Sequence, residues 1–362
     1  MSGRRGPINP LLEEAREYPF AVLERKRQAA EARGTRVINF GMGDPNEETP
    51  AFIREALRQA VPPRSRYPAA HGQAALRAAS AAWARRRFAV TLDPERELLP
   101  VNGSKEGVFL LAQAVIDPRS PRRTIVIPSP FYPVYESGAR FAGGVPHLLR
   151  MDLAHGFRPD LAAVPDEVWE RTALLWLNYP HNPTGAVADD ALYGTALDLA
   201  RRHGFWVASD EAYAEIYFDQ PPRSALEFGL ENLVAFHTLS KRSAMTGYRS
   251  GFMAGDVRLM EALRRFRPNV GVATPDFIQS AAIAAWNDDA HVAEQRALYA
   301  AKREVVRGWM DACGYAIDAS EATFYLWMRA PGGEGYCRWA LVPTLEECRE
   351  AVRRLEAAPV AR

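Results

Sequence analysis

The sequence predicts an α/β protein with a mostly parallel central sheet flanked by helices, followed by a smaller α+β domain. Three observations support this fold class. Short apolar runs ending in polar residues recur through the middle of the chain, a helical pattern separates two of them, and long charged helical patterns follow residue 265. Strands that are buried on both faces of a parallel sheet give such near-continuous apolar runs.

Five segments are predicted to be strands of this sheet: RTIVIPSP (123–130), TALLWLN (172–178), FWVASD (205–210), NLVAFHTLSK (232–241) and GFMAGD (251–256). Between the second and third of them, DDALYGTALDLARRHG has helical apolar spacing. Asp189 or Asp190 can cap this helix, and Gly204 is suited to end it. Strand, helix and strand at this spacing form a βαβ unit, which favours parallel pairing.

The end of the chain has a different pattern. Residues 288–314 form a long charged amphipathic helix, 322–330 (ATFYLWMRA) a strand, and 344–358 a closing helix. We therefore expect a large domain at 41–265 and a small domain at 266–362. The N-terminal segment 1–40 is expected to pack with the small domain.

Composition excludes several functional classes. The 362 residues carry 45 Lys and Arg against 44 Asp and Glu, so the net charge of +1 indicates neither nucleic-acid binding nor a membrane-surface helix. The most apolar stretch, 108–116, is too short to span a bilayer. The three cysteines form no C-x-x-C pair, and residues 1–20 show no apolar signal region. We expect a cytoplasmic protein without a disulfide framework or a zinc site.

Polar residues gather where the predicted strands end, the edge at which open α/β sheets bind ligands. Singly, each has an ordinary explanation as a turn, a helix cap or a solvated basic loop. Together with Arg249 they offer an anion cradle at a helix start, a carboxylate, a phenol and a lysine, which suit an aromatic phosphate-bearing aldehyde with a basic ring nitrogen. The residues concerned are Gly103, Ser104, Lys105, Asn182, Asp210, Tyr213, Ser240 and Lys241.

Three motifs in fixed order carry a family resemblance. NYPHNPTG precedes SDEAY, with Asp210 28 residues after Asn182, and SKRSAMTGYRSGF follows, with Lys241 31 residues after Asp210. This arrangement resembles the class I/II aminotransferases, which are pyridoxal 5′-phosphate (PLP) enzymes of fold type I. The resemblance extends over nearly the whole chain, from GMGDPNEETP to YCRWALVPTLEECREAVRRL.

The resemblance implies a catalytic core of few residues. Lys241 would form the Schiff base to PLP and later move the proton between substrate and cofactor, which suits a lysine whose pKa is lowered by burial and nearby cations. Asp210 would pair with the ring nitrogen and keep it protonated, so that the ring accepts electrons. Ser240 and Arg249 would hold the phosphate, for which a forked guanidinium is well suited.

Further residues are implied around the cofactor. Asn182 and Tyr213 would hydrogen-bond the ring 3-oxygen, and Tyr132 would stack on the ring, although Tyr132 could instead be a core aromatic residue. Gly103, Ser104 and Lys105 would form the phosphate loop.

The resemblance also implies substrate contacts and a partner. Gly43 and Asn182 would lie at the substrate, and Arg338 would bind its α-carboxylate, since a guanidinium forms two parallel bonds to a carboxylate. Tyr67 would reach the phosphate of a second subunit, so a homodimer with shared active sites is expected. No metal is implied.

One segment departs from the family pattern. In relatives a helix and a strand separate a strand like ATFYLWMRA from the GEGY-R segment, whereas here Pro331–Gly333 lead straight into Glu334. Either the small domain is naturally shortened near 331–335, or the sequence is a deletion form. In both cases Arg338 is tethered unusually close to Met328.

The motifs LSKRSAMTGYRSGFMAGD and DDAHVAEQRALYAAKR most resemble those of N-succinyldiaminopimelate aminotransferases of lysine synthesis, in which glutamate donates the amine. A broad aspartate- or alanine-type aminotransferase and a PLP-dependent β-lyase or decarboxylase remain alternatives. A PLP-fold sensor domain would need a DNA-binding module, for which residues 1–40 are too short.

Overall fold

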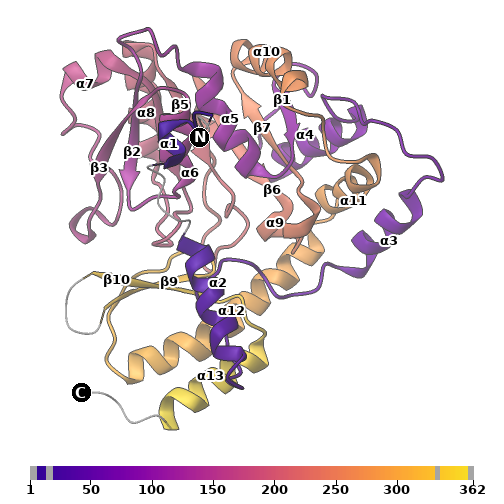
Figure 1. The fold of residues 1–362 in the computed structure, drawn as a ribbon, viewed down its shortest axis with the longest axis vertical. Helices are drawn as coiled ribbons and strands as arrows, with labels where there is room; N and C mark the ends of the chain where they lie inside the picture. The colour runs from indigo at the N-terminus through magenta and orange to yellow at the C-terminus, as the bar shows by residue number, and fades with distance from the viewer. Residues whose placement is uncertain (1–5, 14–18, 331–334, 358–362) are drawn as a thin grey trace, which may run out of the picture.

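A seven-stranded sheet forms the centre of the larger domain (Figure 1). The computed structural model describes residues 6–13, 19–330 and 335–357. Across the sheet the strand order is β1-β7-β6-β5-β4-β2-β3. The strands are β1 (Leu98–Val101), β2 (Thr124–Ser129), β3 (Val145–Arg150), β4 (Thr172–Asn178), β5 (Trp206–Asp210), β6 (Leu233–Thr238) and β7 (Gly251–Gly255).

The sheet is mostly parallel, as predicted, but β7 is not. It pairs antiparallel with both β1 and β6, whereas the other neighbouring strands pair in parallel. The expectation of a parallel strand at 251–256 was therefore wrong in direction. The link from β6 holds only the short helices α9 (Leu239–Arg242) and η3 (Thr246–Tyr248), and a parallel pairing needs a longer crossover, usually a full helix.

Both faces of the sheet are buried, which explains the continuous apolar runs. Leu174 and Trp176 of β4 face one core cluster, while Leu175 and Leu177 face the other. The first cluster is covered by α5 (Ser104–Val115), α6 (Val134–Phe141) and α10 (Val257–Phe266). The second is covered by α3 (Ala51–Ala60), α4 (Ala74–Phe88), α7 (Asp166–Arg171), α8 (Asp190–His203) and α11 (Asp276–Trp286).

The predicted helix between β4 and β5 is confirmed with its caps. The Asp189 side chain accepts a hydrogen bond of 2.8 Å from the Leu192 amide, and α8 follows. Gly204 then adopts a left-handed backbone with φ of 71°, a conformation that glycine takes without steric cost.

The strand at 232–241 ends three residues earlier than predicted. Thr238 is the last residue of β6, and its hydroxyl accepts a hydrogen bond of 3.1 Å from the Ser240 amide. This cap starts α9, so Ser240 and Lys241 lie on a helical turn at the sheet edge.

A smaller α+β domain lies below the sheet in Figure 1. It contains α12 (Ala290–Ala312), α13 (Leu345–Ala357) and an antiparallel sheet in the order β10-β9-β8, with β8 (Ile317–Ala319), β9 (Tyr325–Arg329) and β10 (Tyr336–Ala340). The helix and strand predicted at 288–314 and 322–330 are thus present. Residues 331–334 of the shortened segment lie outside the described residues. On either side of them β9 and β10 pair directly, with Arg338 opposite Trp327.

The packing of α11 and α12 indicates where the boundary between the two domains lies. Ala281, Ala285 and Trp286 of α11 belong to a core cluster of the large sheet, whereas buried residues of α12 join the small-domain cluster. We therefore propose a boundary near residue 288 rather than at 265. Before the large domain lie α1 (Pro10–Glu13) and α2 (Pro19–Glu31), and Phe40 packs on the small-domain cluster.

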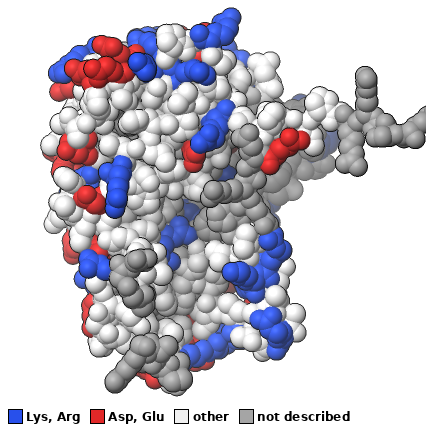
Figure 2. Space-filling model, turned by 60° about the vertical axis from the view of Figure 1, so that its left-hand side comes forward, with Lys and Arg blue, Asp and Glu red and all other residues white. Residues whose placement is uncertain are grey.

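The surface agrees with the near-zero net charge. On the face in Figure 2, Lys and Arg side chains are interspersed with Asp and Glu over its upper part. Across the described ranges, no helix is both long enough and apolar enough to cross a lipid bilayer.

Candidate active site

A cavity of about 500 Å³ opens at the carboxyl ends of β4, β5 and β6, beside the start of α5. This volume suits a small-molecule ligand. Eleven of the thirteen site residues predicted from sequence line it: Gly43, Ser104, Lys105, Tyr132, Asn182, Asp210, Tyr213, Ser240, Lys241, Arg249 and Arg338. The chain thus brings together segments from both domains, because Arg338 comes from β10 of the small sheet.

Lys241 extends from α9 into this cavity, where its Nζ donates a hydrogen bond to the carbonyl oxygen of Gly43. Burial lowers the pKa of the Lys241 ammonium to about 8, because desolvation disfavours the charged form. The Asp44 carboxylate opposes this shift, and the guanidinium groups of Arg249 and Arg338 add to it. The result is an amine that is neutral in a substantial fraction of molecules near neutral pH.

Asp210 ends β5 and is only 5% exposed. Its Oδ2 accepts a hydrogen bond of 2.7 Å from the Tyr135 hydroxyl. The side-chain Nδ2 of Asn178 donates a second hydrogen bond of 2.7 Å to the backbone carbonyl oxygen of Asp210. Burial raises the pKa of this carboxyl to about 6, partly offset by the Tyr135 hydrogen bond. A cationic group placed in the cavity would favour the ionised carboxylate, as a protonated pyridine ring does.

An anion cradle faces Lys241 from the start of α5. Ser104 is the first residue of that twelve-residue helix, whose free amides and dipole favour a phosphate. Gly103 precedes it with φ of 74°, and a Cβ at this position would overlap the Arg249 guanidinium. Arg249 donates to the Thr246 and Asn102 carbonyl oxygens at 2.8 and 3.2 Å, and the Thr238 hydroxyl donates to Ser240 Oγ at 3.0 Å.

The opposite wall of the cavity carries a guanidinium and two phenols. Arg338 donates to Asn182 Oδ1 at 3.0 Å and to the Gly41 carbonyl oxygen at 2.7 Å. The hydroxyls of Tyr213 and Tyr325 lie 2.7 Å apart, within a hydrogen bond. Asn182 and Tyr213 therefore line one cavity, as expected, but each is bonded to a different side chain of the protein.

Two predicted residues lie outside the cavity lining. Gly103 stands directly behind it, where it makes room for Arg249. Tyr67 lies between α3 and α4 with 94% of its side chain exposed. A tyrosine that serves a second subunit would be exposed in this way in one chain, so its role stays a prediction.

Sequence reasoning missed several lining residues, among them Asp44, Tyr135, Asn178 and Tyr325. Asn178 is the last residue of the predicted strand TALLWLN, and Tyr135 lies one helical turn after Tyr132, so both had a usable signal. Tyr135 stacks on Trp176 at 4.4 Å between ring centres, which fixes its hydroxyl toward Asp210. Tyr325 had no local signal, because its contacts come from segments distant in sequence.

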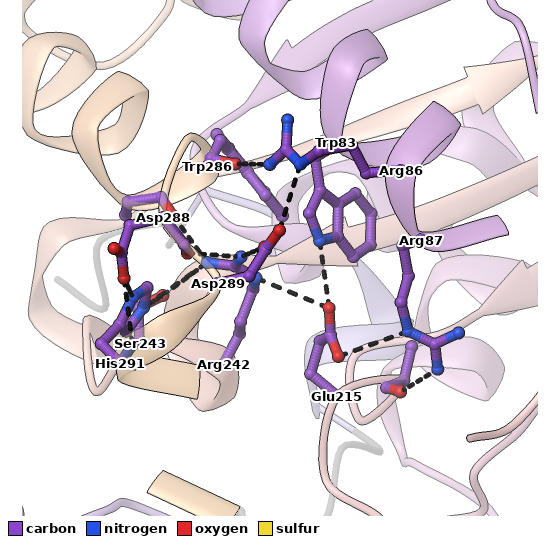
Figure 3. A network of polar contacts seen from close by, with 12 residues as sticks. Trp83, Arg86, Arg87, Glu215, Arg242, Ser243, Trp286, Asp288, Asp289 and His291 are labelled. Atoms are coloured by element: carbon purple, nitrogen blue, oxygen red, sulfur yellow. Dashed lines mark hydrogen bonds and ion pairs between the residues drawn. The ribbon is translucent and has the colours of Figure 1, made fainter. Parts of the chain in front are cut away.

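Behind the cavity, the residue after Lys241 anchors a buried polar network (Figure 3). Arg242, 3% exposed, donates to the Ala285 carbonyl oxygen at 2.7 Å and to Asp289 Oδ1 at 2.8 Å, and its Nε lies 3.8 Å from Glu215. Glu215 in turn accepts from Trp83 Nε1 at 3.0 Å. This network joins the lysine-bearing turn to the link between α11 and α12.

These observations fit PLP. The buried Asp210 matches a cationic ring nitrogen, the amine of Lys241 matches an aldehyde, and the start of α5 with Arg249 matches a phosphate dianion. Among the described residues no cluster of three or more His, Cys, Asp or Glu side chains could hold a metal ion.

Similarity to curated proteins indicates the family to which this chain belongs. An LL-diaminopimelate aminotransferase from Desulforudis audaxviator is 39% identical over 326 residues, covering 87% of this chain and 81% of that protein. One from Moorella thermoacetica is 34% identical over 383 residues, covering 95% and 96%. Because that alignment is longer than the 362 residues of this chain, at least 21 of its positions have no counterpart here, which agrees with a missing unit without locating it.

Solved structures agree in fold. An aminotransferase from Neisseria meningitidis has a TM-score of 0.88 and 33% identity, covering 97% of this chain and 99% of that chain. A probable N-succinyldiaminopimelate aminotransferase from Thermus thermophilus has a TM-score of 0.84 and 28% identity, covering 94% and 100%. The model of the family "Aminotransferase class I and II" matches residues 35–341. This chain therefore belongs to the class I and II aminotransferases, transaminases that use pyridoxal phosphate as cofactor.

Proposed function

We propose that this aminotransferase transfers an amino group between LL-diaminopimelate and 2-oxoglutarate, which becomes glutamate, in a reversible reaction of lysine and diaminopimelate biosynthesis. The observation that carries the proposal is the set of relatives named LL-diaminopimelate aminotransferase, which are 33–39% identical over most of their length. The substrate expected from sequence motifs was the N-succinyl derivative. The names of these relatives favour the unmodified diamino acid instead.

The charges that line the cavity support this choice. Arg338 offers a forked donor for the carboxylate at the reacting end. The Asp44 carboxylate adds an anionic side chain to the lining. An anionic side chain suits the ammonium at the distal end of LL-diaminopimelate, a group that the succinylated compound replaces by an amide bearing a further carboxylate.

The geometry supports the following roles for the residues of this chain. PLP, when bound, would supply an aldehyde for the amino group and a cationic ring as electron acceptor. Lys241 would hold the cofactor and, as a free amine, move a proton to and from the α-carbon of the substrate. Its lowered pKa would let the amine act as a base near neutral pH. Asp210 would keep the ring proton in place, and Arg338 would orient the substrate.

A second candidate is the N-succinyl substrate. It is favoured by the Thermus thermophilus structure, which is named for that compound and whose fold matches over 94% of this chain. A broad aspartate or alanine specificity and β-lyase chemistry are further outcomes that the test must separate.

The test is a substrate comparison on the purified, PLP-loaded protein. Glutamate formed from 2-oxoglutarate is measured by mass spectrometry with LL-diaminopimelate, N-succinyl-LL-diaminopimelate, aspartate or alanine as donor. We expect kcat/KM to be at least about tenfold higher for LL-diaminopimelate, the ratio that 1.4 kcal/mol of differential binding gives. A higher value for the succinylated donor would replace the proposal by the second candidate. Pyruvate released from cysteine or serine without any oxo acid would indicate lyase chemistry.

We also propose a homodimer in which Tyr67 completes the partner's phosphate site. Its 94% exposure between α3 and α4 supports this role. The intact mass of the protein isolated from its native cells, compared with that of the 362-residue chain, distinguishes a naturally short chain from a deletion form.

A further inference from the structure

Tyr325, which no sequence motif marked, touches the residues that serve cofactor and substrate alike. It is the first residue of β9 and is 2% exposed. Its hydroxyl contacts Tyr213, the face of its ring contacts Arg338, and its oxygen lies where a Cβ at Gly43 would stand. Tyr213 and Gly43 lie more than a hundred residues away along the chain, whereas Arg338 lies on the neighbouring strand β10.

The hydroxyl of Tyr325 fixes the phenol of Tyr213. Their oxygens are 2.7 Å apart, and both side chains are buried. If Tyr213 donates its proton to the ring 3-oxygen, the Tyr325 hydroxyl is the group that donates to the Tyr213 oxygen. A donor in such a chain is strengthened by the hydrogen bond that it accepts.

The ring of Tyr325 carries the guanidinium of Arg338. The guanidinium carbon lies 4.4 Å from the ring centre, well within the range of a cation–π contact. The nitrogen atoms of Arg338 bond to Asn182 and to the Gly41 carbonyl oxygen at the same time. The contact with the ring therefore fixes the distance of the guanidinium group from Tyr325, and the two hydrogen bonds fix its orientation.

Gly43 leaves room for the Tyr325 hydroxyl because it has no side chain. A Cβ at this position would overlap the Tyr325 oxygen, so the glycine lets the 41–43 segment approach. The carbonyl oxygen of Gly43 is the acceptor for Lys241 Nζ. Tyr325 thus also defines the position of the segment against which the lysine rests.

We propose that Tyr325 is a positioning residue for transamination: its hydroxyl orients Tyr213 toward the cofactor, and its ring orients Arg338 toward the substrate carboxylate. The proposal rests on the proposed function only in assigning Arg338 to the carboxylate. It assigns a single buried side chain to two tasks, which two substitutions can separate.

Tyr325→Phe removes the hydroxyl and keeps the ring. A weaker Tyr213 donor leaves more electron density on the ring 3-oxygen, which favours the protonated form of the lysine-linked cofactor. We expect the titration midpoint of its visible absorbance band to rise by about half a pH unit. The KM for 2-oxoglutarate, measured by isotope exchange between labelled 2-oxoglutarate and unlabelled glutamate as amino donor, should change less than about twofold, because the ring still carries Arg338.

Tyr325→Leu removes the ring as well. We expect the KM for 2-oxoglutarate to rise about tenfold beyond that of Tyr325→Phe, with the same midpoint shift. If the Leu variant lacks the visible band, Tyr325→Met replaces it, because the longer unbranched side chain of methionine adapts better to an irregular gap. Loss of the band in both, with unchanged unfolding temperatures, would contradict a positioning role.

Tyr299→Phe is the matched control. Tyr299 is fully buried in the same small-domain cluster, and within the described part of the chain its hydroxyl has no hydrogen-bond partner. A midpoint in Tyr325→Phe equal to that in Tyr299→Phe overturns the role of the hydroxyl. An equal KM in the Phe and Leu variants overturns the role of the ring. The glutamate and 2-oxoglutarate pair is used throughout, so a wrong choice of diaminopimelate substrate would leave both measurements intact.

Discussion

At the scale of single residues, the lowered pKa of Lys241 predicts how the protein takes up its cofactor as pH changes. Only the neutral amine attacks an aldehyde, and burial lowers this pKa to about 8. At pH 7.5 roughly a quarter of the molecules then carry the neutral amine, against about 0.1% for an ordinary lysine. The rate at which PLP links to the cofactor-free protein should rise with pH and level off above about 8. This rate is measured from the growth of the visible absorbance band.

Asp44→Asn provides the matched variant for this titration. The Asp44 carboxylate raises the pKa of Lys241, so its removal should shift the midpoint of the rate to lower pH. Lys241→Ala should show no band at any pH. A wild-type midpoint near that of an exposed lysine, about 10, would show that the amine is not desolvated as described.

Asp210 and Tyr135 predict a second effect, on the cofactor's ring proton. Asp210→Asn removes the charge that stabilises this proton, and we expect PLP to stay bound while the proton shift at the substrate slows by at least about a hundredfold. Tyr135→Phe removes only the 2.7 Å hydrogen bond to Asp210 and should slow it less than about tenfold. Single-turnover measurement with glutamate separates the two, and equal rates in Asp210→Asn and the wild type would remove the role of Asp210.

The sequence could predict Asp210 and Lys241 because each follows directly from a recognisable strand. Tyr325 could not be predicted in the same way. It contacts Gly43 and Tyr213, which lie far away in the sequence, and Arg338 of the paired strand β10, and only the folded chain brings these residues together.

At the scale of secondary-structure elements, burial decides which strands were predictable. β4 and β6 are buried along their whole length and therefore have continuous apolar sequences. β3 lies at the sheet edge, contains only half-buried and exposed residues, and gave no such signal. The direction of β7 left no trace in its sequence, because a buried strand needs the same apolar residues in either direction.

The link between α11 and α12 yields a prediction on stability. Arg242→Leu would leave the buried Ala285 carbonyl oxygen without its donor, which costs about 1–3 kcal/mol, whereas Glu215 keeps its ion pairs with Arg87 and Arg296 (Figure 3 shows the Arg87 pair). We expect the free energy of unfolding in urea to fall by about that amount.

Arg86→Leu is the control for that measurement. Arg86 bonds Asp289 and the Trp286 carbonyl oxygen at the exposed edge of the same network, with 40% of its side chain exposed. Exposed pairs of this kind contribute about 1 kcal/mol or less. If both variants lose the same stability, the network does not depend on the burial of Arg242.

At the scale of the whole molecule, the short connection near 331–334 does not keep Arg338 from the site. β9 and β10 pair directly, and this register brings Arg338 across from Trp327 into the cavity. A unit inserted between the two strands in relatives would leave this pairing possible. The sequence alone could not settle the point, because it gives the length of the connection but not the register of the strands it joins.

The proposed dimer yields the last prediction, which mixed subunits can test. Tyr67→Phe should weaken PLP retention about tenfold in a homodimer, since a hydrogen bond to a charged group contributes about 1.5 kcal/mol. In a mixed dimer of Tyr67→Phe with Lys241→Ala subunits, one site receives an intact Tyr67 and an intact Lys241 if the tyrosine acts across the interface. That site should bind PLP as tightly as the wild type, one cofactor per dimer after dialysis. If Tyr67 acts within its own chain, mixing will restore nothing, because the only intact lysine then remains with the altered tyrosine. Wild-type PLP retention in the Tyr67→Phe homodimer would show that Tyr67 does not act at the phosphate.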